Sequence, residues 1–281
     1  MKVLFVSDFN LSQNYGGAQV SNQAIIDAGK SAGHNIKLHT FDSDYTDFFC
    51  SYDLIISSNL EVISKKDPDK LNLICNHNNH IRLEHDSCFY LDKQVRKNLF
   101  LSTQKTFFLS DFHASFFKSL YGNIFNNIEI VPDPIDEEIF FAKEEEKTYD
   151  IIYCGFLHEL KGLNNLIKFA TDNPSRKIDV FGWGTINLES FFLNFDNINF
   201  HGRVSHQETA SIYRKSKAIF HNPIVNEPFC RMIAESILCG VKEFHGDMAR
   251  IGSHLDFKEK GLEQFSEECK NAQNIFWEKV L

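Results

Sequence analysis

The 281-residue chain lacks several features that would each point to a particular class of protein. No stretch approaches the roughly 18 consecutive apolar residues of a membrane-spanning helix, so we expect no such helix. The start, MKVLFVSDFN, reaches Asp8 too early for the apolar segment of a secretory signal peptide. Basic residues are in deficit: 29 Lys and Arg against 38 Asp and Glu give a net charge of −9. This balance argues against a general nucleic-acid coat.

The seven cysteines stand singly and form no C-x-x-C pair. An odd number of scattered cysteines indicates reduced thiols and predicts a cytoplasmic protein. Clustered zinc ligands are lacking as well, and we expect no zinc site. The one group of close histidines is His77, His80 and His85, which we take up with the candidate site.

The chain does have a repeated alternation of short apolar runs with helical patterns. The predicted strands are Val3–Val6, Ile36–Thr40, Leu54–Ser57, Leu71–Cys75, Leu99–Ser102, Phe107–Leu109, Ile128–Val131, Ile151–Cys154, Ile178–Phe181, Ile198–His201 and Ala218–His221. The predicted helices are Ala18–Ala32, Asp111–Tyr121, Leu163–Ala170, Gln207–Lys215 and Phe229–Cys239. Consecutive apolar residues are typical of strands covered on both faces, and their alternation with helices predicts parallel sheets. We therefore predict an α/β fold.

A charged segment divides the chain into two predicted domains. Residues 142–149, AKEEEKTY, are typical of a solvated linker. They separate a first domain, residues 1–141, from a second, residues 142–256. Residues 257–281 have apolar side chains at helical spacing and are expected to form a closing helix, which could pack back on the first domain. Two doubly wound domains of this kind would face each other across a cleft, with ligands at the strand-to-helix turns.

Two of these turns carry residues suited to a phosphorylated ligand. Gly16 and Gly17 stand directly before a predicted helix, where backbone amides can approach a diphosphate. The turn is not G-x-G-x-x-G, which disfavours a dehydrogenase, and an ordinary flexible loop is the alternative. Lys161 lies where the first helix of the second domain begins, so its ammonium and the helix dipole could act on one phosphate. A solvated lysine is the alternative there.

A third turn runs from Asn222 into the helix that ends near Gly240. We expect Pro228 at the first helical position, with Glu227 as its cap. Phe229, Met232, Ile233 and Ile237 should form the buried stripe of this helix, and Glu235 should lie well off it. At 1.5 Å per residue the two glutamates are about 12 Å apart along the axis, which suits two ends of one ligand.

An ordered series of motifs resembles the retaining GT-B glycosyltransferases of the group-1 class (glycosyltransferase family 4). The matching residues are Gly155-Phe156-Leu157, Lys161-Gly162, Gly182-Trp183-Gly184, Phe200-His201-Gly202, Asn222-Pro223 and Glu227-Pro228-Phe229-Cys230 through Glu235-Ser236. Val131-Pro132-Asp133-Pro134-Ile135-Asp136 is similar to the family's domain junction, and Gly16-Gly17 resembles its first glycine loop. The resemblance spans most of residues 1–245 and implies two Rossmann-like domains.

The resemblance implies a retaining hexosyltransferase that moves a sugar from a nucleoside diphosphate sugar to an acceptor hydroxyl. Glu235 would bind the donor ribose, while Glu227 and the amides of Phe229, Cys230 and Arg231 would hold the transferred sugar. Lys161 and the Gly16-Gly17 amides would neutralise the diphosphate without a divalent metal or other cofactor. His80, or alternatively His77, would lie near the sugar, and a surface loop histidine is the competing interpretation for both.

The sequence also departs from the family pattern. Phe156 replaces the usual arginine beside the diphosphate lysine, and Cys230 replaces a common glycine. Arg231, Arg203 or, more weakly, His158 would have to supply the missing charge. The segment after Gly240 is short, so the second domain is expected to lack one or two strand-helix units.

Two other functions therefore stay open: a nucleotide-sugar binding protein without transfer activity and, less favoured, a sugar-nucleotide epimerase. The expected acceptor is a glycan, a lipid or a small molecule, with no nucleic acid and no evident membrane docking. The sequence does not specify the base, the sugar or the acceptor.

Overall fold

The computed structural model describes residues 1–43, 49–87 and 91–281. They form two compact units, Met1–Pro134 with Glu267–Leu281 (unit 1) and Ile135–Ser266 (unit 2). The change from unit 1 to unit 2 therefore precedes the charged segment 142–149. Within the described residues, no helix is both long and apolar enough to cross a bilayer.

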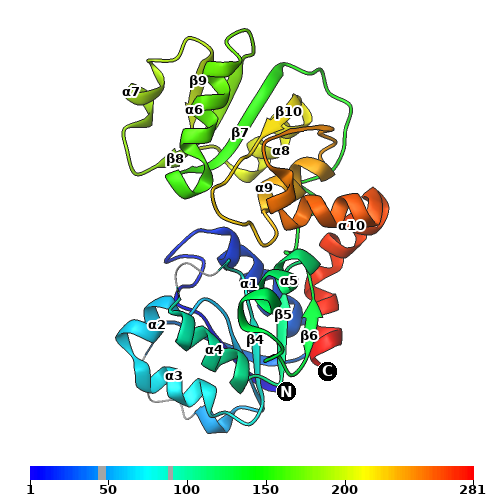
Figure 1. The fold of residues 1–281 in the computed structure, drawn as a ribbon. Coiled ribbons are helices and arrows are strands. Elements are labelled where there is room, and N and C mark those ends of the chain that lie inside the picture. Colours follow the sequence, from blue (N-terminus) through cyan, green and yellow to red (C-terminus); the bar gives the residue numbers. More distant parts are fainter. Residues whose placement is uncertain (44–48, 88–90) are drawn as a thin grey trace. The chain divides into compact units, whose positions relative to one another are not determined.

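Unit 1 is built on a six-stranded parallel sheet in the order β2-β1-β3-β4-β5-β6 (Figure 1). Its strands are β1 (Lys2–Val6), β2 (Asn35–His39), β3 (Leu54–Ser57), β4 (His80–Leu83), β5 (Lys105–Phe108) and β6 (Ile128–Ile130). Its helices are α1 (Gly17–Ser31), α2 (Glu61–Lys66), α3 (Pro68–Cys75), α4 (Lys93–Ser102) and α5 (Asp111–Tyr121). The side chains of Leu4, Val6 and Ile55 join those of Ile63, Ile74 and Leu99 in one core, so α2, α3 and α4 cover one face of the sheet.

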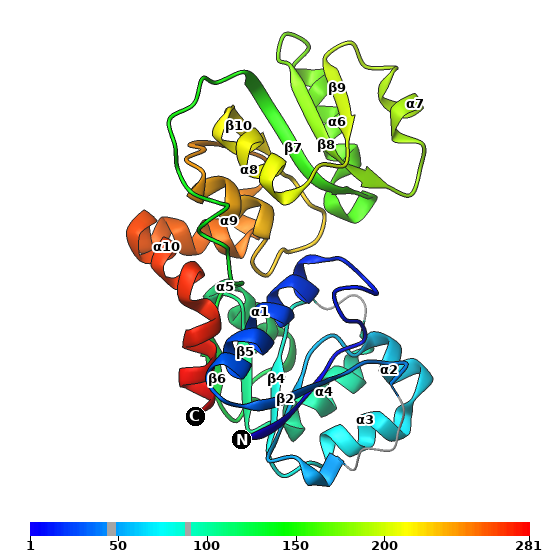
Figure 2. The same cartoon turned by 180° about the vertical axis from the view of Figure 1, so that it is seen from behind.

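The other face of unit 1 is covered by α1 and by the end of the long last helix, α10 (Gly252–Val280), as Figure 2 shows from behind. Trp277 donates its indole N–H to the carbonyl oxygen of Ile25 at 2.8 Å. A Cβ at Gly29 would lie 2.3 Å from the Trp277 ring, so this close approach requires glycine. α10 begins in unit 2, and Gly261 (φ 76°, ψ 171°) kinks it before its last residues join unit 1.

Unit 2 is built on a five-stranded parallel sheet in the order β11-β10-β7-β8-β9. Its strands are β7 (Tyr149–Leu157), β8 (Ile178–Gly184), β9 (Ile198–Gly202), β10 (Ser216–Phe220) and β11 (Glu243–His245). Its helices are α6 (Leu163–Asp172), α7 (Leu188–Phe192), α8 (His206–Arg214), α9 (Arg231–Leu238) and the start of α10. The predicted α/β fold with two doubly wound sheets is thus confirmed.

Two predicted strands are wrong, because Leu71–Cys75 and Leu99–Ser102 lie in helices α3 and α4. Asp67 caps α3 by accepting from the Lys70 amide, and Pro68 occupies its first turn, as helix starts favour. Asp92 caps α4 in the same way, accepting from two backbone amides. The apolar residues of these two runs therefore lie on helices, and other segments form the strands of the sheet.

Two strands, β4 and β11, were not predicted from the sequence, and β4 pairs with β3 and β5 in the middle of unit 1. Its sequence, His-Ile-Arg-Leu, alternates polar and apolar residues, yet all four side chains are buried. Arg82 can be buried there because its guanidinium binds the Glu84 carboxylate at 3.1 Å. A buried ion pair thus conceals this strand from a search for apolar runs.

Each sheet has one point where the strand order reverses, between β1 and β3 in unit 1 and between β7 and β10 in unit 2. Loops at the carboxyl ends of such strands diverge, and open parallel sheets bind their ligands in the space this leaves. In unit 2 the turns that follow β7 and β10 contain Lys161 and Glu227.

Candidate functional site

The turns after β7 and β10 are held together by backbone and side-chain hydrogen bonds. The Ile224 amide donates to the Leu160 carbonyl oxygen at 3.0 Å, and the Asn165 amide group donates to the Asn222 carbonyl oxygen at 2.7 Å. Gly162 is left-handed (φ 88°), and a Cβ there would lie 2.1 Å from the Asn222 oxygen. Only glycine fits this approach, which sets the position of Lys161 against the second turn.

Lys161 and Glu227 form an ion pair at the strand reversal of unit 2. Lys161 Nζ lies 2.7 Å from Glu227 Oε1, with 39% of the lysine side chain exposed but only 9% of the glutamate side chain. Burial alone would raise the pKa of Glu227, but Lys161 and then His221 hold it at about 2. The site therefore presents a partly exposed ammonium above a buried, ionised carboxylate.

The loop from Glu227 to Cys230 is not helical, so the prediction that Glu227 caps the helix at Pro228 is wrong. α9 begins at Arg231, and its cap residue is Cys230, with a left-handed φ of 70°. The Glu227 backbone amide donates to the Arg250 carbonyl oxygen instead, and the Gly252 amide donates to the Glu227 carbonyl oxygen. These bonds hold the backbone extended and leave the Glu227 carboxylate for other partners. The left-handed φ of Cys230 is a conformation that glycine adopts more readily than cysteine.

Glu235 lies inside unit 2, so the prediction that it stands well off the buried face of its helix is wrong. α9 is buried all round from Ile233 to Leu238, and 6% of Glu235 is exposed. Its carboxylate lies 3.3 Å from Arg231 Nη2, one helical turn earlier. A buried carboxylate near a helix start can accept hydrogen bonds from ligand hydroxyls with little competition from water.

Aromatic rings occupy the carboxyl ends of β7 and β8, and Phe156 of β7 stands where the pattern that the sequence resembles has an arginine. Phe156 stacks on His158 with 5.7 Å between ring centroids, and its centroid lies 6.0 Å from that of Trp183. The Arg203 guanidinium lies 4.6 Å from the Trp183 ring. His158 Nδ1 accepts from the Leu160 amide and fixes the turn before Lys161. Of the possible substitutes for the missing arginine, Arg231 is paired with Glu235 and Arg203 stacks on Trp183.

His80 does not have the position predicted for it. It is the first residue of β4 and fully buried, where Ser57 Oγ and Ser102 Oγ lie 2.7 and 3.2 Å from its ring nitrogens. Burial and then Arg82 lower the pKa of His80 to about 3, so the ring is neutral. The alternative, His77, has its ring nitrogens 2.9 and 3.1 Å from two carbonyl oxygens. Both rings thus contact other residues of unit 1. The run Leu71–Cys75 before them is part of helix α3 and not a strand.

Gly16 and Gly17 begin the 15-residue helix α1 in unit 1. Gly16 is the cap residue in an extended conformation (φ −135°), and no side chain caps the described start of this helix. Neither glycine adopts a left-handed φ. The turn therefore offers open backbone amides at a helix N-terminus, which is the property expected of it.

A group of carboxyls at the strand reversal of unit 1 was not predicted. Asp8 follows β1 and accepts from the Val62 and Ile63 amides at 2.8 Å each. Burial and then the neighbouring Asp8 raise the pKa of Glu61 to about 7. Burial and then Glu61 raise the pKa of Asp86 to about 7 as well. Each residue follows a different strand, so only the sheet order brings them together.

We expect Glu61→Gln to change the pH dependence of stability. Because the folded-state pKa is raised, the folded protein keeps a proton that the unfolded chain releases, and stability falls as the pH rises from about 4.5 to about 7. Glutamine removes this loss. The variant should gain about 1–3 kcal/mol relative to the parent at pH 8 compared with pH 5. Thermal unfolding at both pH values measures this, with the exposed Glu278→Gln as control. An equal change in stability of Glu61→Gln at pH 5 and pH 8 would contradict the prediction.

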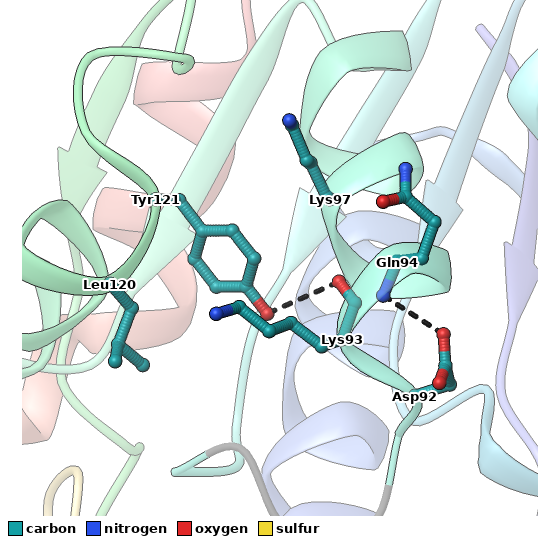
Figure 3. A pocket seen from close by; sticks show the side chains of 6 residues that line it. All are labelled: Asp92, Lys93, Gln94, Lys97, Leu120 and Tyr121. Atoms are coloured by element: carbon teal, nitrogen blue, oxygen red, sulfur yellow. Dashed lines mark hydrogen bonds between the residues drawn. The ribbon is translucent and has the colours of Figure 1, made fainter.

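A separate pocket in unit 1 is lined by none of the predicted site residues (Figure 3). It lies at the start of α4 and the end of α5 and is lined by Asp92, Lys93, Gln94, Lys97, Leu120 and Tyr121. The Tyr121 hydroxyl donates to the Lys93 carbonyl oxygen at 3.4 Å, and Asp92 accepts from the Gln94 amide at 2.8 Å. Several of its polar groups are thus already hydrogen-bonded at the start of α4.

Potential metal ligands do not gather in the part of the chain that is described. No group of three or more His, Cys, Asp or Glu side chains has a suitable arrangement there. The described cysteines, six in all, are free thiols.

Comparisons with known proteins bear on both units. The family model described as "Glycosyl transferases group 1" matches residues 134–242. Comparison with curated protein sequences gives no match. Among solved structures, Anabaena HepE in complex with UDP is similar, with a TM-score of 0.65, 14% identity, and coverage of 98% of this chain and 94% of that one.

Two further structures are similar at comparable length. Sucrose-phosphate synthase from Thermosynechococcus elongatus has a TM-score of 0.69 and 12% identity, with 99% of this chain and 96% of that chain covered. An alpha-glucosyltransferase in complex with UDP and a DNA containing an HMU base has a TM-score of 0.60 and 12% identity, with coverage of 100% and 95%. The chain thus has the GT-B fold of these glycosyltransferases.

Proposed function

We propose that the protein is a retaining glycosyltransferase that moves a sugar from a nucleoside diphosphate sugar to an acceptor hydroxyl. The observation that carries this proposal is the Lys161–Glu227 ion pair at the strand reversal of unit 2. It combines a partly exposed cation for a diphosphate with a buried carboxylate for sugar hydroxyls, inside the region that matches the group 1 glycosyltransferases. Two of the similar structures hold UDP, which supports a nucleotide ligand.

The proposed roles follow the order of the residues around this pair. Lys161 neutralises the charge that grows on the departing phosphate. Glu227 and the amides of Phe229, Cys230 and Arg231 hold the transferred sugar, and Glu235 binds the ribose hydroxyls. The buried position of Glu235 supports this role, because a ribose hydroxyl can replace water there without leaving the carboxylate unpaired. For the uncapped amides at Gly16 and Gly17 we propose a phosphate contact.

Glu227 is proposed to position the sugar and not to attack it. Its carboxylate is ionised, but its nearer oxygen already accepts from Lys161. We propose same-face attack by the acceptor hydroxyl, assisted by the departing phosphate, so that the anomeric configuration is retained. Lysine and backbone amides stabilise the leaving group in this scheme without a divalent metal. The free described cysteines support a reducing, cytoplasmic setting.

Phe156 favours a second candidate, a protein that binds nucleotide sugars without transferring the sugar. An aromatic ring stands where a guanidinium would strengthen leaving-group stabilisation, while the ring leaves ligand binding by Lys161 and Glu235 intact. Release of nucleoside diphosphate from the bound donor, on addition of an acceptor, distinguishes the enzyme from this binding protein.

The proposed function predicts metal-free binding of one nucleotide class. Thermal unfolding would be measured with UDP, GDP, ADP and CMP and their common sugar derivatives, each with and without EDTA. A ligand at 100 times its dissociation constant should add about 2.7 kcal/mol of stability, which is a clear rise in midpoint. A rise that survives EDTA is expected for one base. No rise with any nucleotide would contradict the proposal.

A further inference from the structure

A buried histidine stands beside Glu227 without a role in the proposed function. His221 directly follows β10, and its amide donates to the His245 carbonyl oxygen of β11 at 2.9 Å. The residue is 3% exposed, and neither ring nitrogen has a hydrogen-bond partner among the described residues. Its Nε2 lies 3.6 Å from Glu227 Oε1, the oxygen that accepts from Lys161. This distance is just beyond a hydrogen bond.

When a ligand binds, two anions compete for the Lys161 ammonium: the Glu227 carboxylate and the diphosphate. In the structure its ammonium is 2.7 Å from Glu227, and the proposed function assigns the same ammonium to a diphosphate. Movement of Nζ toward the phosphate would remove the main partner of Glu227. A buried carboxylate that loses its partner is strongly destabilised unless another donor replaces it.

His221 is suited to be that donor. An approach of about 0.5 Å would bring its Nε2–H into hydrogen-bond range of Oε1. Tyr153, whose ring centroid is 6.2 Å from that of His221, donates its hydroxyl to the Phe156 carbonyl oxygen at 2.9 Å and is therefore committed elsewhere. The β10–β11 hydrogen bond of the His221 amide fixes the backbone from which the ring extends.

We propose that His221 is a positioning residue. It replaces Lys161 as the hydrogen-bond donor to Glu227 when the Lys161 ammonium moves to the ligand phosphate. The Nε2–H of the ring donates to Glu227 Oε1, which keeps the carboxylate ionised and aimed at the sugar. The histidine thereby lowers the cost of releasing Lys161, so that phosphate binding and Glu227 orientation are coupled. This inference rests on the proposed function of the Lys161–Glu227 site.

The test is a double-mutant cycle on nucleotide affinity. His221→Phe keeps the ring packing but removes the donor, and it should weaken binding of the preferred nucleoside diphosphate about tenfold in calorimetry. In a Lys161→Ala background no ion pair has to be broken, so the same change should weaken binding less than about threefold. His221→Gln restores an N–H donor and should return affinity to within about threefold of the parent.

Controls separate this coupling from a general loss of structure. His254→Phe and His254→Gln alter another buried histidine of unit 2, in α10, and they should leave nucleotide affinity unchanged. An equal loss for His221→Phe with and without Lys161, or no rescue by His221→Gln, would overturn the inference. If the parent binds no nucleoside diphosphate, the proposed function itself fails; if it binds and the cycle shows no coupling, this inference alone fails.

Discussion

Lys161→Ala and Glu227→Ala are each expected to lower sugar transfer about 100-fold to 1,000-fold while the protein stays folded. Removal of a preorganised cation at a developing negative charge typically costs this much, which is the case of Lys161, and the loss of Glu227 removes the group that positions the sugar. Lys161 is partly exposed, so its loss removes little packing, and Glu227→Ala leaves an ammonium that water can still reach. The measurement is nucleoside diphosphate release with donor and acceptor, together with the midpoint of thermal unfolding.

Matched controls come from the same part of unit 2. Glu159→Ala lies in the same turn as Lys161 and is exposed, and Lys168→Ala removes an exposed lysine from the following helix. Both should transfer sugar at the parent rate. Near-normal turnover in both Lys161→Ala and Glu227→Ala would mean that the ion pair is structural, and the assigned roles would be wrong.

Most of the fold follows from the local sequence. Runs such as Val3–Val6 and Leu54–Ser57 have consecutive apolar residues, and the strands that they form are buried on both faces. The sequence around the two wrongly predicted strands does contain helix-start residues, but the prediction gave more weight to the number of consecutive apolar residues. Asp67-Pro68 and Asp92 are helix-start residues, and the helices that begin there contain Leu71–Cys75 and Leu99–Ser102.

The site was predictable only in part, because its key contacts join distant residues. The turns containing Lys161 and Glu227 could be found from the sequence, but their contact depends on β7 and β10 being neighbours at the strand reversal. The role of Glu227 as a cap failed because Cys230 adopts a left-handed conformation that delays the helix. His221 gave no signal at all: it follows an apolar strand, and only the folded sheet places it beside Glu227.

The buried charges of unit 1 show the same dependence on distant contacts. Glu84 is fully buried and binds Arg82 Nη2 at 3.1 Å, with Arg96 Nε at 3.9 Å from the same oxygen. The Arg96 guanidinium also lies over the Phe117 ring, 5.2 Å from its centroid. Against the opposing effect of burial, Arg82 and then Arg96 lower the pKa of Glu84 to about 2. One carboxylate thus compensates two buried guanidinium groups.

Glu84→Gln should therefore be among the most destabilising single substitutions in unit 1. The amide keeps the shape of the side chain but leaves both arginines without a charge partner, and breaking a buried ion pair in this way costs about 3–5 kcal/mol. Chemical denaturation measures the free energy of unfolding at neutral pH. The control is Asp172→Asn, which breaks an exposed pair with Lys168 and should cost less than about 1 kcal/mol. A similar small loss for both variants would show that the arginines find other compensation, and that Glu84 is not the anion on which this core depends.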